Sequence, residues 1–254
     1  MKTNGLAAQH YLLEVALRRE KIASFAAYPF NLPAVRHLAS QSLILHPKAT
    51  FLVGENGSGK STLLEAIAIA WGFNPEGGTR NFSFSTRDSH SDLHAALRMS
   101  KGIHRPKDGF FLRAESFFNV GTEIERLDRE PGGPPIIGAY GGRYLHDMSH
   151  GESFFALLHN RFFGHGLYIL DEPEAALSPT RQLAMLARFH ELAGQHSQFV
   201  IATHSPILMA YPDADIYQID ERGLTRTAYE DTEHYIVAKA FLNDTKRQLA
   251  RICA

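Results

Sequence analysis

The residues with the clearest chemistry in this chain lie between Gly54 and Ser61. They read Gly-Glu-Asn-Gly-Ser-Gly-Lys-Ser, which matches the phosphate-binding loop pattern G-x-x-x-x-G-K-[ST] at every position. Glycines permit backbone angles that turn successive N–H groups toward one anion. Lys60 would reach the β- and γ-phosphates, and the Ser61 hydroxyl would ligate Mg²⁺. The pattern predicts a nucleoside triphosphate site whose contacts are Gly54, Glu55, Asn56, Gly57, Ser58, Gly59, Lys60, Ser61 and Thr62.

The segments on both sides of this loop have the pattern that a phosphate site needs. Thr50–Val53 is a short apolar and β-branched run typical of a buried strand, and Lys60–Trp71 has the apolar spacing of a helix. The positive N-terminal end of such a helix points at the anion that the loop holds. An ordinary glycine-rich turn is the alternative, and the flanking strand and helix argue against it.

Bulk properties limit the class of protein. The 254 residues suit one large α/β domain, and the net charge of −1 gives no strong overall attraction to nucleic acid or membrane. The single cysteine, Cys253, excludes an intrachain disulfide and favours a reducing compartment. No apolar run approaches the roughly 18 residues of a membrane helix. We expect a soluble, cytoplasmic protein.

Apolar runs and turn residues predict the remaining elements. Ser149 and Glu152 have the spacing of a capping box, so a helix is expected to begin there and to close at Gly164. Ser178 followed by Pro179 predicts the start of another helix, which runs to Gly194. The other expected elements are strands at Tyr11–Ile22, Ser42–Leu45, Gly109–Phe118, Leu167–Glu172 and Phe199–Thr203, a hairpin at Ile216–Arg226 and a C-terminal helix at Thr232–Ile252.

Two features leave alternatives open. Tyr28 or Phe30 could stack on an adenine, although an aromatic residue beside proline commonly packs within its own loop. The segment from Arg80 to Arg113 contains seven Lys or Arg residues but only three Asp residues. This excess of positive charge could contact phosphate backbones, or it could be a solvated surface.

Four further segments, in their order along the chain, resemble ABC-type ATPases, so ATP is the expected nucleotide. The resemblance implies that Asp171 holds Mg²⁺ and that Glu172 polarises the attacking water. His204, in Ala-Thr-His-Ser-Pro, resembles the switch histidine that contacts the γ-phosphate, and Glu172, His204 and Lys60 are therefore the expected catalytic residues. The segment from Ser149 to Ser153 resembles the signature motif, with Ser149 and Gly151 in place, and Pro173–Ser178 resembles the D-loop.

The chain departs from that family pattern in two ways. No glutamine occurs between Arg80 and His150, so the usual Q-loop residue is missing, and Glu115 is its best substitute as a ligand of Mg²⁺. The interval from Glu115 to Ser149 is too short for the coiled coil of SMC proteins, and it looks truncated for the helical subdomain of transporter subunits. The chain looks most similar to small soluble ATPases of the SMC-like and DNA-repair-like kind.

These observations predict an α/β P-loop fold with a mostly parallel sheet and an antiparallel N-terminal β-portion. We expect one domain, residues 1–254, with a reduced lid at about 76–148. The resemblance implies an ATPase that needs Mg²⁺ and works as an ATP-dependent homodimer, possible DNA binding, and no stable membrane partner. The alternative is the cytoplasmic ATP-binding subunit of an ABC membrane transporter.

Overall fold

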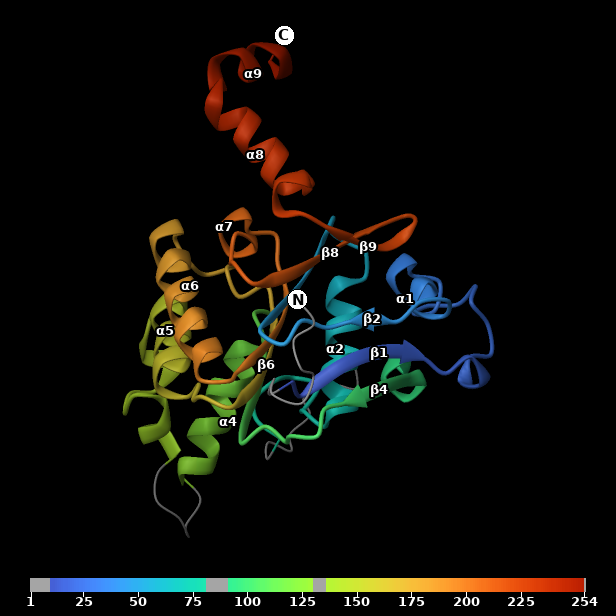
Figure 1. Cartoon of the computed structure of the whole chain (residues 1–254). Coiled ribbons are helices and arrows are strands. Elements are labelled where there is room, and N and C mark those ends of the chain that lie inside the picture. The colour runs from blue at the N-terminus through green and yellow to red at the C-terminus, as the bar shows by residue number, and fades with distance from the viewer. Residues whose placement is uncertain (1–9, 81–90, 130–135, 254) are drawn as a thin grey trace.

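The computed structural model describes residues 10–80, 91–129 and 136–253. Within these residues, the strands form two sheets (Figure 1). The larger sheet has the order β5-β6-β7-β3-β8-β9, in which all neighbouring pairs are parallel except β8 and β9. The smaller sheet is antiparallel, with the order β2-β1-β4. The expected fold class, a mostly parallel sheet with an antiparallel N-terminal portion, is confirmed.

The centre of the large sheet is built from strands that are buried along their whole length, β3, β6 and β7. The members of the whole sheet are β3 (Ala49–Gly54), β5 (Asp108–Arg113), β6 (Gly166–Asp171), β7 (Gln198–Ala202), β8 (Ala214–Asp220) and β9 (Gly223–Thr227). The small sheet consists of β1 (Leu12–Leu17), β2 (Leu43–Ile44) and β4 (Leu97–Lys101). Parallel strands need crossover segments, which explains why helices separate most of the strands of the large sheet.

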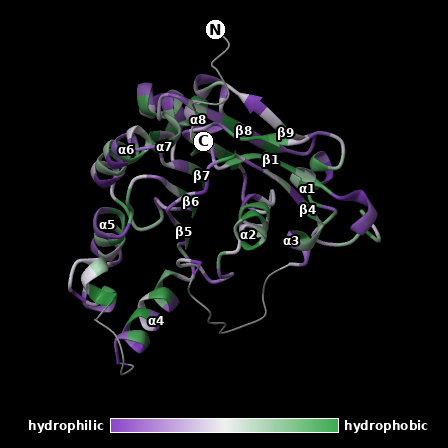
Figure 2. Ribbon diagram, turned by 60° about the horizontal axis from the view of Figure 1, so that its bottom comes forward, coloured by the Kyte–Doolittle hydropathy of each residue, from purple (hydrophilic) through white to green (hydrophobic). Residues whose placement is uncertain are grey.

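Alternate side chains of each central strand enter two different cores. Phe51 and Val53 belong to the core on the side of α4–α7, whereas Leu52 belongs to the core that contains α2 and the small sheet. Figure 2 shows α4, α5 and α6 on one side of β5–β7 and α2 on the other. The helices that precede the C-terminal pair are α1 (Pro33–Leu38), α2 (Lys60–Trp71), α3 (Leu93–Ala96), α4 (Phe117–Arg129), α5 (His150–Asn160), α6 (Pro179–Gly194) and α7 (Pro206–Met209).

Most expected elements are present, and the differences have local causes. The first strand ends at Leu17 rather than Ile22, because a single 3-10 turn follows at Arg19–Lys21. The helix that begins at Ser149 ends at Asn160, before Gly164. The expected C-terminal helix is two helices, α8 (Glu233–Asn243) and α9 (Thr245–Ile252), since the Asp244 side chain accepts from the Arg247 N–H and caps a new helix.

The interval expected to form a lid, residues 76–148, contributes to both sheets. Strand β4, which the sequence did not predict, pairs with β1, and β5 is an edge strand of the large sheet. Long-range pairing with β1 gives the polar segment Leu97–Lys101 its extended form. Among the described residues, the helical part of the interval consists of the short α3, of α4 and of the 3-10 turns at Ile136–Tyr140 and Leu145–Asp147.

Candidate nucleotide site

The phosphate loop, Asp171, Glu172 and His204 lie at the carboxyl ends of three adjacent strands, whereas Glu115, Ser149 and Gly151 do not. The phosphate loop follows β3, Asp171 ends β6, and His204 lies just beyond β7. Because β6, β7 and β3 are adjacent in the sheet, residues far apart in the chain come together at this edge. Ligands of open α/β sheets bind outside the carboxyl ends of the strands, so this edge is where a nucleotide site is expected.

The phosphate loop has the backbone that its glycines allow. Gly57 and Gly59 have φ values of +81° and +96°, a region that residues with a side chain rarely adopt. A Cβ added at Gly57 would meet nothing within 4 Å, so the space above the loop is open. Among the described residues, the buried Ser58 hydroxyl has no hydrogen-bond partner. A cavity of about 220 Å³ lies over this loop.

Lys60 is folded back onto the loop that precedes it. Its Nζ donates to the carbonyl oxygens of Gly54 and Glu55, at 2.8 and 2.9 Å, and the residue is only 4% exposed. Burial lowers the pKa of Lys60, and the carboxylates of Glu172 and Asp171 oppose this effect. The ammonium group is therefore held at the cavity by bonds to carbonyls, which an anion can replace.

Ser61 and Asp171 form the direct link between the phosphate loop and β6. The Ser61 hydroxyl donates to Asp171 Oδ1 at 2.9 Å. Burial raises the pKa of Asp171 to about 6, against the lowering effects of the Ser61 hydrogen bond and of Arg113. A buried carboxylate beside a hydroxyl, with its charge poorly compensated, is a suitable environment for a hard divalent cation with oxygen ligands.

Glu172 follows Asp171 in an unusual backbone conformation. Its φ is +49°, in the left-handed region, and its N–H donates to the Ala202 carbonyl of β7 at 2.9 Å. Such angles cost on the order of 1–3 kcal/mol and tend to occur at functional sites. The Glu172 side chain is 41% exposed and lines the cavity over the phosphate loop, so its carboxylate is accessible to water.

His204 is held by two acidic residues on the loop after β6. Its backbone N–H donates to Glu174 Oε1 at 2.6 Å, and its Nε2 lies 3.7 Å from Glu172 Oε1. Burial, and then the charge of Lys60, lower the pKa of His204. Sequence reasoning placed Glu174 only within a D-loop resemblance. In the structure, burial raises the pKa of Glu174, and its carboxylate positions the His204 backbone. The spacing of the acidic residues after β6 is the signal that could have suggested this role.

One of the two candidate aromatic residues lies at the cavity. Tyr28 lines it, and the Tyr28 hydroxyl is 3.4 Å from Thr62 Oγ1 at the start of α2. Phe30 instead packs against the apolar core that contains α2. The geometry therefore leaves Tyr28 as the aromatic residue that is available for stacking.

Glu115 is not brought to this cavity. Its side chain is 87% exposed, and Oε2 lies 3.5 Å from Arg113 Nη2. Arg113 also forms a salt bridge of 2.8 Å with Glu65 on α2. In the part of the chain that the structure describes, no group of three or more acidic, histidine or cysteine residues could hold a metal ion. A role for Glu115 at a metal stays a prediction.

Ser149 and Gly151 lie at the N-terminus of α5 and form a separate structure. The expected capping box is present: the Glu152 N–H donates to Ser149 Oγ, and the Ser149 N–H donates to Glu152 Oε2. A Cβ on Gly151 would lie 2.3 Å from Arg181 Nη1 and 2.9 Å from the Ala176 carbonyl, so glycine is required for this close approach. Neither residue is among those that line the phosphate-loop cavity.

Comparison with known proteins agrees with this arrangement. Residues 23–111 match a family described as "AAA domain", and residues 137–210 match one described as "AAA domain, putative AbiEii toxin, Type IV TA system". A solved metal-chelate-type ABC transporter, in an inward-facing conformation, superimposes with a TM-score of 0.50 at 15% identity. The superposition covers 90% of this chain and 88% of that one. At this identity the similarity concerns the fold.

Two curated proteins share sequence with the chain. A multidrug efflux ATP-binding/permease protein of Mycobacterium bovis is 26% identical over 235 residues, which are 86% of this chain and 19% of that protein. The DNA replication and repair protein RecF of Colwellia psychrerythraea is 48% identical over 46 residues, 18% of this chain and 11% of that protein. The chain thus spans at most about a fifth of the length of these relatives.

Both matching family models are AAA domains, and the fold is shared with a solved ABC transporter structure, which agrees with the phosphate loop at Gly54–Ser61. Within the described residues, no helix combines the length and the apolar character that are needed to cross a bilayer.

Proposed function

We propose that this chain binds ATP with Mg²⁺ and hydrolyses it to ADP and phosphate. The observation that carries the proposal is the 2.9 Å hydrogen bond between Ser61 of the phosphate loop and Asp171 of β6. It joins the first turn of α2 to the acid at the end of β6, two strands away from β3 in the sheet. Lys60 and Glu172 lie at the same cavity.

The residues present fit a nucleoside triphosphate and its cation. The open space above Gly57 gives room for phosphate oxygens, and Lys60 and Ser61 line the same cavity. The raised pKa of Asp171 indicates a carboxylate that gains from a nearby cation. The loop N–H groups and the N-terminus of α2 favour negative charge at this place.

Each side chain then has a distinct task. Bound Mg²⁺ would neutralise the charge that develops on the transferred phosphoryl group. Ser61 and Asp171 would hold that cation, and Lys60 would exchange its carbonyl partners for phosphate oxygens. Glu172 would orient water and accept its proton, and His204 would donate a hydrogen bond near the γ-phosphate. Tyr28 would stack on the base.

A complete site is proposed to need two copies of the chain. In this arrangement Ser149 and Gly151 of one copy contact the ATP that is held by the phosphate loop of the other. Two observations support this arrangement. Among the described residues that line the phosphate-loop cavity, Ser149 and Gly151 do not occur, and both lie at the positive N-terminal end of α5. The proposed assembly is an ATP-dependent homodimer in the cytoplasm.

The test is phosphate release by the purified chain with ATP, in Mg²⁺ and in EDTA, over a wide range of protein concentration. A shared site predicts that the rate per chain rises with concentration and then saturates, because only the dimer is active. Lys60→Ala serves as the control for contaminating ATPases. No release above this control at any concentration would refute the proposal.

For the biological role we propose action on nucleic acid, with a transporter motor as the alternative. The local similarity to RecF, a DNA replication and repair protein, and the basic segment around β4 support the first. Similarity to the efflux protein supports the second. Among the basic residues, Arg98, Lys101, Arg105 and Lys107 are exposed, and Lys101 also lies over the Trp71 ring. Arg87 and Asp88, in the same segment, lie outside the described residues.

Salt dependence separates these roles. In a Glu172→Gln chain with ATP, replacing both Arg105 and Lys107 by Gln should weaken duplex DNA binding for all sequences. Each lost phosphate contact should reduce the log–log salt slope by about 0.9. Absence of salt-sensitive DNA binding, together with co-purification of a membrane protein, would favour the transporter role.

A further inference from the structure

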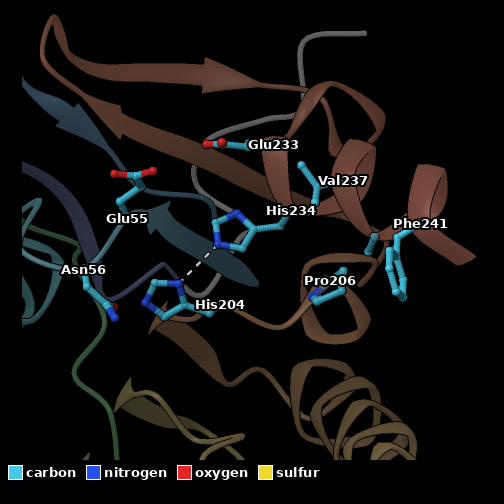
Figure 3. Close-up of a pocket in the computed structure, with 9 residues that line it drawn as sticks. Glu55, Asn56, His204, Pro206, Glu233, His234, Val237 and Phe241 are labelled. Carbon is cyan, nitrogen blue, oxygen red and sulfur yellow. Dashed lines mark hydrogen bonds between the residues drawn. The ribbon is translucent and has the colours of Figure 1, made fainter. Parts of the chain in front are cut away.

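A second cavity lies beside the phosphate loop and is closed on one side by α8. Its volume is about 770 Å³, and Glu55, Asn56 and His204 line it together with residues of α8 (Figure 3). His234 lies in the first turn of α8, near the C-terminal end of the chain, and its side chain points toward His204, which follows β7 (Figure 3). His204 Nδ1 and His234 Nε2 are 3.2 Å apart, a hydrogen-bond distance.

The surroundings of His204 decide which ring donates in this hydrogen bond. His204 Nε2 faces the Glu172 carboxylate at 3.7 Å, where a proton on the nitrogen is attracted and a lone pair is repelled. Burial lowers the pKa of both histidines, so both rings are neutral near pH 7. A neutral ring with its proton on Nε2 has a bare Nδ1. His204 Nδ1 therefore accepts, and the His234 Nε2–H donates.

We propose that His234 is a positioning residue for the ATPase site: its Nε2–H holds His204 in the Nε2-protonated tautomer and aims that N–H toward Glu172. The inference rests on the proposed function, because the donor matters for catalysis only if the γ-phosphate comes to this place. A neutral His204 can donate there only from Nε2, since its Nδ1 is occupied by His234. The second nitrogen of a functional histidine commonly has such a partner, which fixes the tautomer.

The start of α8 is held in place without this hydrogen bond. The buried Thr232 caps the helix by accepting from the Tyr235 N–H at 3.3 Å, and it donates to the Tyr229 carbonyl at 2.7 Å. The Tyr229 hydroxyl donates to the Pro206 carbonyl at 2.9 Å, which ties this region to α7. A change at His234 therefore removes a ring contact without removing the cap of the helix.

The test compares His234→Phe, His234→Gln and the wild-type chain. Phenylalanine keeps a ring but has no donor, whereas the glutamine amide can donate to His204 Nδ1. The direct readout is the ring-nitrogen NMR signals of His204 in the nucleotide-free protein, assigned by their loss in His204→Gln. We expect the Nε2–H tautomer in the wild type and in His234→Gln, and a mixture of tautomers in His234→Phe. His190→Phe, at an exposed position of α6, controls for replacing a histidine.

Kinetics give the second readout. We expect kcat for ATP to fall about 10-fold in His234→Phe, the lower end of the effect of losing a partner that orients a functional histidine. KM should change little, and His234→Gln should recover most of the loss. An unchanged His204 tautomer or an unchanged kcat in His234→Phe would overturn the inference. If the wild-type chain hydrolyses no ATP but His234→Phe shows the expected change of the His204 tautomer, the proposed function is refuted and the positioning contact remains supported.

Discussion

Polar side chains at the phosphate-loop edge and at the N-terminus of α5 differ in where their hydrogen-bond partners lie and in how well their charge is compensated. At the loop, Ser61 bonds to Asp171, 110 residues away, and the buried Asp171 lacks full compensation of its charge. At α5, Ser149 and Glu152 satisfy each other within a single turn, and both are exposed to solvent. At the phosphate loop, a bound cation can therefore compensate the charge of Asp171. At α5, the hydrogen bonds between Ser149 and Glu152 are already formed within one turn.

This difference indicates where binding energy can be gained. Hydrogen bonds from the Ser149 N–H and hydroxyl lower the pKa of Glu152, which therefore remains ionised at the helix end. An ATP molecule held by a second copy would have to approach beside this carboxylate. We therefore expect α5 to contribute to catalysis only after dimerisation, while the loop binds nucleotide in a single chain.

The largest expected effect separates binding from hydrolysis at the loop. Glu172→Gln should keep ATP affinity, because no phosphate contact is removed. Hydrolysis should fall by about 10²–10⁴, the usual contribution of a positioned general base. Equilibrium binding of a fluorescent ATP analogue and single-turnover phosphate release measure the two properties. Wild-type turnover would show that Glu172 has another task.

Mixing experiments test whether the two regions belong to different copies. Ser149→Arg should abolish turnover but leave ATP binding by the monomer intact, and Lys60→Ala should be inactive for lack of binding. An equal mixture should regain about a quarter of wild-type activity, since half the dimers are mixed and each mixed dimer has one intact site. Ser149→Thr, which keeps a capping hydroxyl, is the matched control. A mixture that gains no activity would contradict independent shared sites.

The uncompensated charge at Asp171 predicts a gain of stability when it is removed. The pKa of this carboxyl is about 6 in the folded chain and 3.8 for the free group. Above pH 6 the folded chain holds an unfavourable charge, so Asp171→Asn should stabilise the protein in EDTA at pH 8 by up to about 3 kcal/mol. As the pH falls from about 7 to 4, Asp171 becomes protonated and the free energy of unfolding of the wild type rises by the same amount. The difference in stability between the two proteins should therefore vanish near pH 4.

Urea unfolding at both pH values measures this difference. Ser149→Ala removes a satisfied cap instead, and should destabilise the chain by about 1 kcal/mol at either pH. Equal stability of Asp171→Asn and the wild type at pH 8 would show that the carboxylate is already compensated. The same Asn variant should lose Mg²⁺-dependent turnover.

The smallest effect is expected at Glu115. Because this side chain is exposed and close to Arg113, Glu115→Ala should reduce turnover only a few-fold, and the reduction should be greatest at low Mg²⁺. Turnover measured across a Mg²⁺ titration gives the answer, with Glu125→Ala on α4 as a control. Identical titration curves would limit Glu115 to its contact with Arg113.

Features that depend on nearby residues could be predicted from the sequence alone. The strand, loop and helix from Ala49 to Trp71, the capping box at Ser149 and the proline-started helix after Ser178 all depend on contacts within a few positions. Glycines, caps and apolar periodicity act over this range, so their pattern is sufficient to predict them. The roles assigned to these residues remain predictions.

Other features depend on the order of strands and on distant partners. The strand order β6-β7-β3 brings Ser61 to Asp171, and the return of the chain through α8 brings His234 to His204. Strand β4 is extended because it pairs with β1. Local propensity contains no information about such contacts, since their stability comes from burial and hydrogen bonds between segments that meet only in the folded chain. The sequence by itself determined the phosphate loop; the tertiary structure decided which residues surround it.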